Sequence, residues 1–198
     1  MNFNKFTVKA QEAVQAALDM AANRNHQAVE PEHMLRALLS DPDSVAVTLL
    51  KKLGVQQQKL EMETDRLLSR LPVVSGSSVG GQYLSNTMKD VFDKAQKLAT
   101  KMGDEYISSE HVLLALTDSS SEVAKAIKAQ GVSNDSLTKA IKEIRGNQRN
   151  LRETNKRNPR KSSKPTGNHQ PEMNNEQFAI EISSTLKLFH HKSGECSQ

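Results

Sequence analysis

Apolar residues recur every three or four positions along most of the first 146 residues, which is the spacing of helices that bury one face. One such stretch follows Thr7 and a matching stretch follows Ser85, and both residue types are favoured N-caps. The pattern therefore predicts two long amphipathic helices. Their apolar positions are Ala10, Ala13, Val14, Ala17, Leu18 and Ala21 in one, and Met88, Val91, Phe92, Ala95, Leu98, Ala99 and Met102 in the other.

Three further helices are predicted after each long helix. The second begins at residues 30–31 or 108–109, where proline or serine suits a first turn. The third covers residues 45–53 or 123–130 and ends at a glycine followed by a valine, which is typical of a left-handed C-cap with an apolar contact behind it. The apolar positions of the fourth are Leu60, Leu67, Leu68 and Leu71, or Leu137, Ile141 and Ile144.

The two sets of helices are copies of one sequence unit. Matching residues lie 78 positions apart through the second helix and 77 apart after one loop residue is lost. The pairs include Thr7 and Ser85, Ala17 and Ala95, Ala21 and Ala99, Glu32 and Glu110, His33 and His111, Leu35 and Leu113, Ala37 and Ala115, Leu38 and Leu116, Gly54 and Gly131, and Leu60 and Leu137. Because the matches are mostly small, apolar or capping residues, the duplication favours a scaffold that presents a surface over an enzyme.

Charge divides the chain into two parts. Residues 1–144 hold 17 Lys and Arg against 18 Asp and Glu, whereas residues 145–198 hold 10 against 5. The nearly neutral first part gives no electrostatic reason to expect a nucleic-acid partner. The basic run at residues 145–164 has no aromatic residue to stack on a base, so we interpret it as a solvated tail.

These patterns predict an all-α fold with one eight-helix domain at residues 1–148 and a disordered basic tail at residues 149–198. The two repeats cover about residues 4–71 and 83–146 and are joined by a glycine- and serine-rich surface loop. A short apolar segment at residues 178–189 fits a strand and a helix turn equally well. The N-terminus has no apolar leader, and no stretch approaches the roughly 18 apolar residues of a membrane span, so we expect a cytoplasmic protein without a membrane partner.

Two groups of chemically suggestive residues have simpler explanations. His33 and His111 follow glutamate at matching positions in a first helical turn, and we expect them to cap and pack rather than bind metal. The tail residues His190, His191 and Cys196 have a spacing that fits no common zinc module, and Cys196 has no framework to fix a catalytic base. No metal site and no catalytic residue is expected.

Several motifs together resemble the N-terminal domain of the Clp AAA+ unfoldases. They include Val-Glu-Pro-Glu-His at residues 29–33, Ile-Ser-Ser-Glu-His at 107–111, and the segment 6–13. With the junction segments 71–76 and 80–85, they look like the ClpB disaggregase branch. The resemblance covers about residues 1–148 and implies a double four-helix repeat.

The resemblance also implies a function. In that family such a domain recognises unfolded or aggregated polypeptide for an AAA+ disaggregase, and residues matching Thr7, Asp104 and Glu110 lie on the face implicated in substrate handling. Capping at helix N-termini is the competing role for these three residues. Tyr83 and Leu84, at the mouth of the second repeat, are candidate residues of an exposed apolar groove, and the domain is expected to be a monomer.

The chain departs from the family in one respect. No glycine is followed by lysine, so the phosphate-binding pattern Gly-x-x-x-x-Gly-Lys-Ser/Thr is absent. We therefore expect a non-enzymatic chain without a nucleotide or other cofactor. A stand-alone domain, a truncated gene and a reading frame broken near Asn150 all remain open.

Two rival functions belong to other classes. The chain could be an adaptor that docks on a separately encoded AAA+ ring through residues 178–189. Alternatively, it could associate with nucleic acid through its basic tail, which the neutral domain makes the weaker hypothesis.

Overall fold

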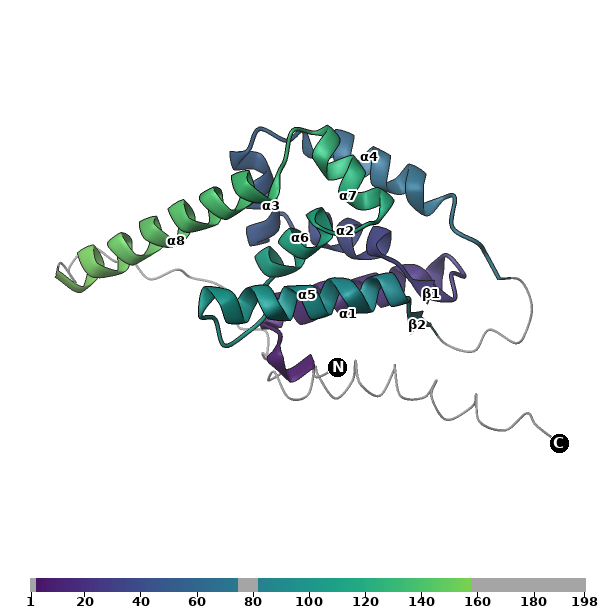
Figure 1. The fold of residues 1–198 in the computed structure, drawn as a ribbon, viewed down its shortest axis with the longest axis horizontal. Coiled ribbons are helices and arrows are strands. Elements are labelled where there is room, and N and C mark those ends of the chain that lie inside the picture. Colours follow the sequence, from purple (N-terminus) through teal and green to yellow (C-terminus); the bar gives the residue numbers. More distant parts are fainter. Residues whose placement is uncertain (1–2, 75–81, 158–198) are drawn as a thin grey trace, which may run out of the picture.

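The structure, a computed structural model, describes residues 3–74 and 82–157, with side-chain environments as far as Gly146. A short 3₁₀ helix, η1 (Phe3–Lys5), precedes the first set of four helices, and a second set follows the central loop (Figure 1). This confirms the prediction of a duplicated, all-α, eight-helix fold. The helices are α1 (Val8–Asn23), α2 (Pro31–Ser40), α3 (Val45–Lys52), α4 (Gln57–Leu68), α5 (Asn86–Met102), α6 (Ser109–Thr117), α7 (Glu122–Ala129) and α8 (Asn134–Arg157).

The helix ends follow the predicted capping chemistry. The Thr7 hydroxyl accepts a hydrogen bond from the Ala10 N–H at 3.3 Å, and the Ser85 hydroxyl accepts one from the Met88 N–H at 3.0 Å. Gly54 and Gly131, which follow α3 and α7, have φ angles of 76° and 82°. This left-handed backbone is unfavourable for residues with a Cβ, which explains why glycine stands at both places.

The two histidines close capping boxes, as expected. The His33 Nδ1 accepts a hydrogen bond from the Glu30 N–H, and the His111 Nδ1 accepts one from the Ser108 N–H, each at 3.0 Å. Each imidazole therefore satisfies a backbone donor that the first turn of its helix leaves without an intrahelical partner.

Each repeat pairs the segment before its first helix with the loop before the second helix of the other repeat. At the first junction, residues 5–7 pair with Ile107: the Thr7 N–H donates to the Ile107 carbonyl at 2.9 Å, and the Ile107 N–H donates to Lys5 at 2.7 Å. At the second junction, the two-residue strands β1 (Ala28–Val29) and β2 (Tyr83–Leu84) pair in parallel. The 78-residue offset relates one junction to the other, and neither pairing was predicted.

The core is shared between the repeats. Phe3 and Phe6 pack against Phe92 of α5, with ring centroids 6.3 Å and 5.4 Å apart. Helices α2 and α6 lie at the centre, and every residue of α6 is buried. This central position explains why α6 carries apolar residues around most of its circumference rather than on one face.

Helix α8 is longer than predicted. It runs to Arg157 and projects away from the other helices (Figure 1). Residues 149–157, which the sequence assigned to the tail, thus continue this helix. The remaining tail, including the apolar segment 178–189, lies outside the described residues. None of the helices in the described part is long and apolar enough to cross a membrane.

Candidate functional site

The five residues predicted to bind substrate divide between the two junctions. Thr7, Asp104 and Glu110 surround the first junction, whereas Tyr83 and Leu84 form β2 at the second. Helix α1 runs from the first junction to the second, and its 16 residues span about 24 Å at 1.5 Å per residue. The five residues therefore do not line one site.

The first junction presents apolar side chains beside polar ones. Val8 and Tyr106 flank the Thr7–Ile107 hydrogen bond, and their side chains are 37% and 43% exposed. Ile107 itself is buried. The junction therefore combines accessible apolar area with the nearby carboxylates of Asp104 and Glu110.

A charged network lies at the same junction. The Arg145 guanidinium donates to Asp104 Oδ2 at 2.6 Å from Nη2 and to Glu110 Oε1 at 2.9 Å from Nε. Its Nη2 makes a second, short contact with Glu110 Oε1. Asp104 Oδ2 also lies 3.0 Å from His111 Nε2. Because His111 Nδ1 accepts from the Ser108 N–H, the neutral ring carries its proton on Nε2 and donates it to Asp104.

The network shifts the pKa values of its bases in opposite directions. Burial lowers the pKa of His111 and outweighs the acids Glu110 and Asp104, which act to raise it. For Arg145, burial acts to lower the pKa, but the hydrogen bonds to Glu110 and Asp104 prevail and raise it. At neutral pH the site therefore holds a neutral imidazole, and its guanidinium is charged.

The equivalent place in the first repeat is built differently. The His33 Nε2 lies 2.8 Å from His26 Nδ1, and His26 is the residue that the 78-residue offset places at Asp104. Burial, reinforced by the neighbouring His26, lowers the pKa of His33 to about 4. Burial also raises the pKa of Glu32, which is the repeat equivalent of Glu110.

The second junction has only one of its two predicted residues at the surface. Tyr83 is 49% exposed, but Leu84 is only 7% exposed, so the expectation that Leu84 is an exposed groove residue is wrong. The repeat explains its burial, because Leu84 corresponds to the fully buried Phe6.

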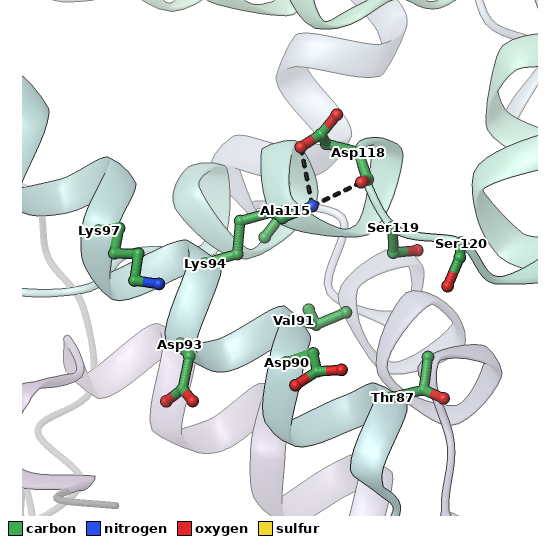
Figure 2. A pocket seen from close by; sticks show the side chains of 10 residues that line it. All are labelled: Thr87, Asp90, Val91, Asp93, Lys94, Lys97, Ala115, Asp118, Ser119 and Ser120. Carbon is green, nitrogen blue, oxygen red and sulfur yellow. Dashed lines mark hydrogen bonds and ion pairs between the residues drawn. The ribbon is translucent and has the colours of Figure 1, made fainter.

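Each repeat also has a groove between its first and second helices. The larger, of about 450 Å³, lies between α5 and the end of α6 (Figure 2). Its repeat counterpart beside α1 and α2 measures about 210 Å³. In the larger groove, Lys94 reaches across to Asp118, donating to its carbonyl at 2.7 Å, and its Nζ lies 2.8 Å from Asp118 Oδ2. This bridge and the exposed carboxylates nearby give the groove a mixed-charge rim.

Three residues of the first junction, Val8, Tyr106 and Arg145, are not among those predicted to form the site. The repeat contained a signal that could have identified Arg145. The 77-residue offset pairs this arginine with Leu68, which is buried, so a charged residue at position 145 is unexpected. Within the described residues, no cluster of three or more histidine, cysteine or acidic side chains could hold a metal ion. His190, His191 and Cys196 lie outside those residues.

Comparisons with known proteins place the chain in a family. Residues 5–130 match the sequence model of the Clp repeat N-terminal domain, and the chain belongs to that family. It is 40% identical over 145 residues to the chaperone protein ClpB of Bacteroides thetaiotaomicron, covering 73% of this chain and 16% of that protein. It is also 40% identical over 143 residues to ClpB of Mycobacterium bovis, covering 72% of this chain and 17% of that protein. The chain thus spans about a sixth of the length of the curated relatives it matches.

Solved structures share the fold at lower sequence identity. The Hsp104 N-terminal domain from Candida albicans superposes with a TM-score of 0.62 at 24% identity, covering 72% of this chain and 92% of that one. The N-domain of ClpV from Vibrio cholerae gives a TM-score of 0.61 at 21% identity, with 72% and 86% covered. A complex of a ClpV N-domain with a VipB peptide gives 0.57 at 20% identity, with 68% and 83% covered.

Proposed function

We propose that this chain is a non-enzymatic recognition domain that binds apolar segments of unfolded or aggregated polypeptide for an AAA+ disaggregase. The observation that carries the proposal is the first junction, where Val8 and Tyr106 expose apolar area beside Thr7, Asp104 and Glu110. An extended segment with apolar residues can cover the two exposed side chains. A basic residue next to them would meet the partly exposed carboxylate of Asp104.

The backbone around this surface is firmly placed. Thr7 and Ile107 join the two repeats by hydrogen bonds, and the Thr7 hydroxyl caps α1. A preformed surface loses little conformational entropy on binding, which suits weak capture of many different segments. In this proposal Thr7 acts both as a cap and as part of the binding surface, and Tyr83 supplies a second exposed contact at the other junction.

The relatives support this kind of function. Two of the relatives that match over the whole domain are chaperone proteins named ClpB. No glycine of the sequence is followed by lysine, so the phosphate-loop pattern that would bind ATP is absent from this chain. We propose that it acts with an AAA+ ring.

The test is binding of casein, an unfolded protein, to the full chain and to a chain that ends at Arg157. We expect weak binding in both, reduced only slightly by salt, because apolar contact releases few counterions. Binding that disappears with residues 158–198 and with added salt would place the affinity in the basic tail, and this result would overturn the proposal.

A pair of matched variants places the binding surface. Tyr106→Ser removes an exposed ring at the first junction and should weaken casein binding by about threefold or more, because buried aromatic contacts dominate such interfaces. Met62→Ser is the control, since Met62 is 74% exposed on α4, a helix that packs against α2, α3 and α7. Equal effects of the two substitutions would contradict the assignment of the surface to the first junction.

The second candidate function is docking on a partner protein. It is favoured by the structural likeness to a ClpV N-domain that was solved with a VipB peptide. The partner here would be a separately encoded AAA+ ring. A pull-down with that ring distinguishes the two, because an adaptor binds folded ring subunits and the recognition domain binds casein without them.

A further inference from the structure

Arg145 ties α8 to the loop before α6 and to α6 itself. Among the α8 residues whose side chains the structure describes, Ile144 is the last that packs against the core. A Cβ added at Gly146 would meet nothing within 4 Å, so the helix position next to Arg145 faces open space. Between these two positions the guanidinium of Arg145 binds Asp104 and Glu110.

Through this contact Arg145 already binds the acid pair of the proposed binding surface, which consists of Asp104 and Glu110. The guanidinium contacts both carboxylates, and hydrogen bonds between charged partners are the strong kind. The side chains of Arg145 and Asp104 nevertheless remain 29% and 31% exposed. A partner's basic side chain can therefore reach Asp104, whereas the Glu110 side chain is only 11% exposed, and at Asp104 it meets a cation of the same chain already in place.

The repeat indicates that the fold does not require this ion pair. At the position equivalent to Arg145, the first repeat has Leu68, which is buried in the α4 packing. At the position equivalent to Asp104 it has His26. One copy of the unit thus folds with a leucine and a histidine at these places, so the arginine and aspartate of the second copy are an addition to the common architecture.

We infer that Arg145 is an internal competitor for the substrate surface: it occupies Asp104 and Glu110 and holds α8, and a basic side chain of a bound polypeptide exchanges with it. This inference rests on the proposed function and adds a regulatory contact to the same site. Exchange replaces one cation by another on the same two carboxylates, so neither carboxylate is left buried without a partner.

Linkage makes the effect reciprocal. If a basic segment binds better when Arg145 has left the acids, its binding must in turn favour release of the Arg145 side chain from the acids by the same factor, and α8 then loses one of the contacts that hold it. Occupancy of the first junction is thereby coupled to the helix that leads to the rest of the chain. Because repeat 1 has no such arginine, the coupling belongs to the second repeat alone.

The experiment uses two fluorescent peptides of leucine and phenylalanine that differ in one central residue, arginine or its uncharged isostere citrulline. Binding is measured for the full chain and for the variants Arg145→Met and Lys142→Met. Lys142 is exposed on α8, so its substitution removes the same charge from the same helix without touching the acid pair.

We expect Arg145→Met to bind the arginine peptide about five- to tenfold more tightly than the unmodified chain does, which is the size of effect that a partly exposed ion pair gives. Its affinity for the citrulline peptide should be unchanged. Lys142→Met should alter neither affinity by more than about twofold, because its exposed charge has only a long-range effect.

Hydrogen exchange of the α8 amides gives a second readout. The arginine peptide should accelerate exchange in residues 134–146 of the unmodified chain, and the citrulline peptide should not. Arg145→Met should exchange faster than Lys142→Met without any peptide.

The inference is overturned if Arg145→Met leaves the arginine-peptide affinity unchanged or lower, or if α8 exchange does not respond. If neither peptide nor casein binds the unmodified chain, the proposed function and the competition fail together, and the exchange of Arg145→Met alone still decides whether Arg145 holds α8.

Discussion

At the residue scale, the two capping histidines show how one framework accepts different chemistry. Both use Nδ1 to accept a backbone N–H, which leaves Nε2 as the donor. In the first repeat that donor faces His26, and in the second it faces Asp104. The sequence could predict the cap, because it depends on residues three positions apart. It could not predict the partner of Nε2, because that contact joins a helix to a loop.

The histidine pair makes stability depend on pH. The pKa of His33 falls from its usual 6.5 to about 4 in the folded chain, so below pH 6.5 the unfolded chain binds a proton that the folded chain does not. Stability should therefore fall as the pH is lowered from about 6.5 to about 4, by up to about 3 kcal/mol for this group. Urea unfolding at pH 7, 6 and 5 measures the slope.

His33→Gln is the matched variant for this slope, because glutamine at this position can still close the capping box. As the pH is lowered from about 6.5 to about 4, its free energy of unfolding should fall less steeply than that of the unmodified chain. The reason is that one fewer side chain takes up a proton on unfolding. Equal slopes for the two proteins would show that His33 does not titrate as its burial requires.

A second prediction at this scale concerns neighbouring residues of β2. Leu84→Ser should lower the free energy of unfolding by about 2–4 kcal/mol, because it empties a buried site and places a hydroxyl there. Tyr83→Ser, at a half-exposed position, should cost about 1 kcal/mol or less. Urea unfolding of both variants checks this, and a neutral Leu84→Ser would contradict the burial of its side chain.

At the element scale, most helix boundaries could be predicted because their signals are local. The stop of α3 at Gly54 depends on one left-handed residue, and the start of α5 depends on Ser85. Strands β1 and β2 could not be predicted, because each has only two residues and exists through pairing with the other repeat. The full length of α8 was missed because residues 149–157 lack an apolar stripe.

The ends and interior of helices predict opposite effects for two glycine substitutions. Gly103 ends α5 with φ 77°, so Gly103→Ala should cost about 1 kcal/mol in left-handed strain. Gly146 lies inside α8 with open space around it, so Gly146→Ala should stabilise the helix by up to about 1 kcal/mol. Thermal unfolding followed by circular dichroism compares them, and a shift in the same direction for both would contradict this assignment of the helix ends.

At the scale of the whole molecule, the duplication was legible in the sequence, but the way the copies combine was not. Apolar periodicity shows that each unit has a face to bury and says nothing of which face of the other unit covers it. In the structure, Phe6 of one repeat packs on Phe92 of the other, and each repeat supplies the pairing partner at one junction. The residues of the candidate site come together for the same reason, since Thr7 belongs to the first repeat and Asp104 to the second.

Because each repeat supplies a pairing partner to the other, we expect the connecting loop to be dispensable for holding the two repeats together. A chain cut by a protease site placed within residues 75–81 should remain a complex of its two halves on gel filtration and keep its helical circular dichroism. The physical reason is that the Phe3, Phe6 and Phe92 cluster and both junctions join the halves without using the loop.

Phe92→Ala removes the shared aromatic contact, and it should lower stability by about 3–5 kcal/mol and promote separation of the cut halves. Separation of the unmodified halves into two folded units would instead mean that each repeat is an independent domain, and a surface built from Thr7, Asp104 and Glu110 together could not then persist.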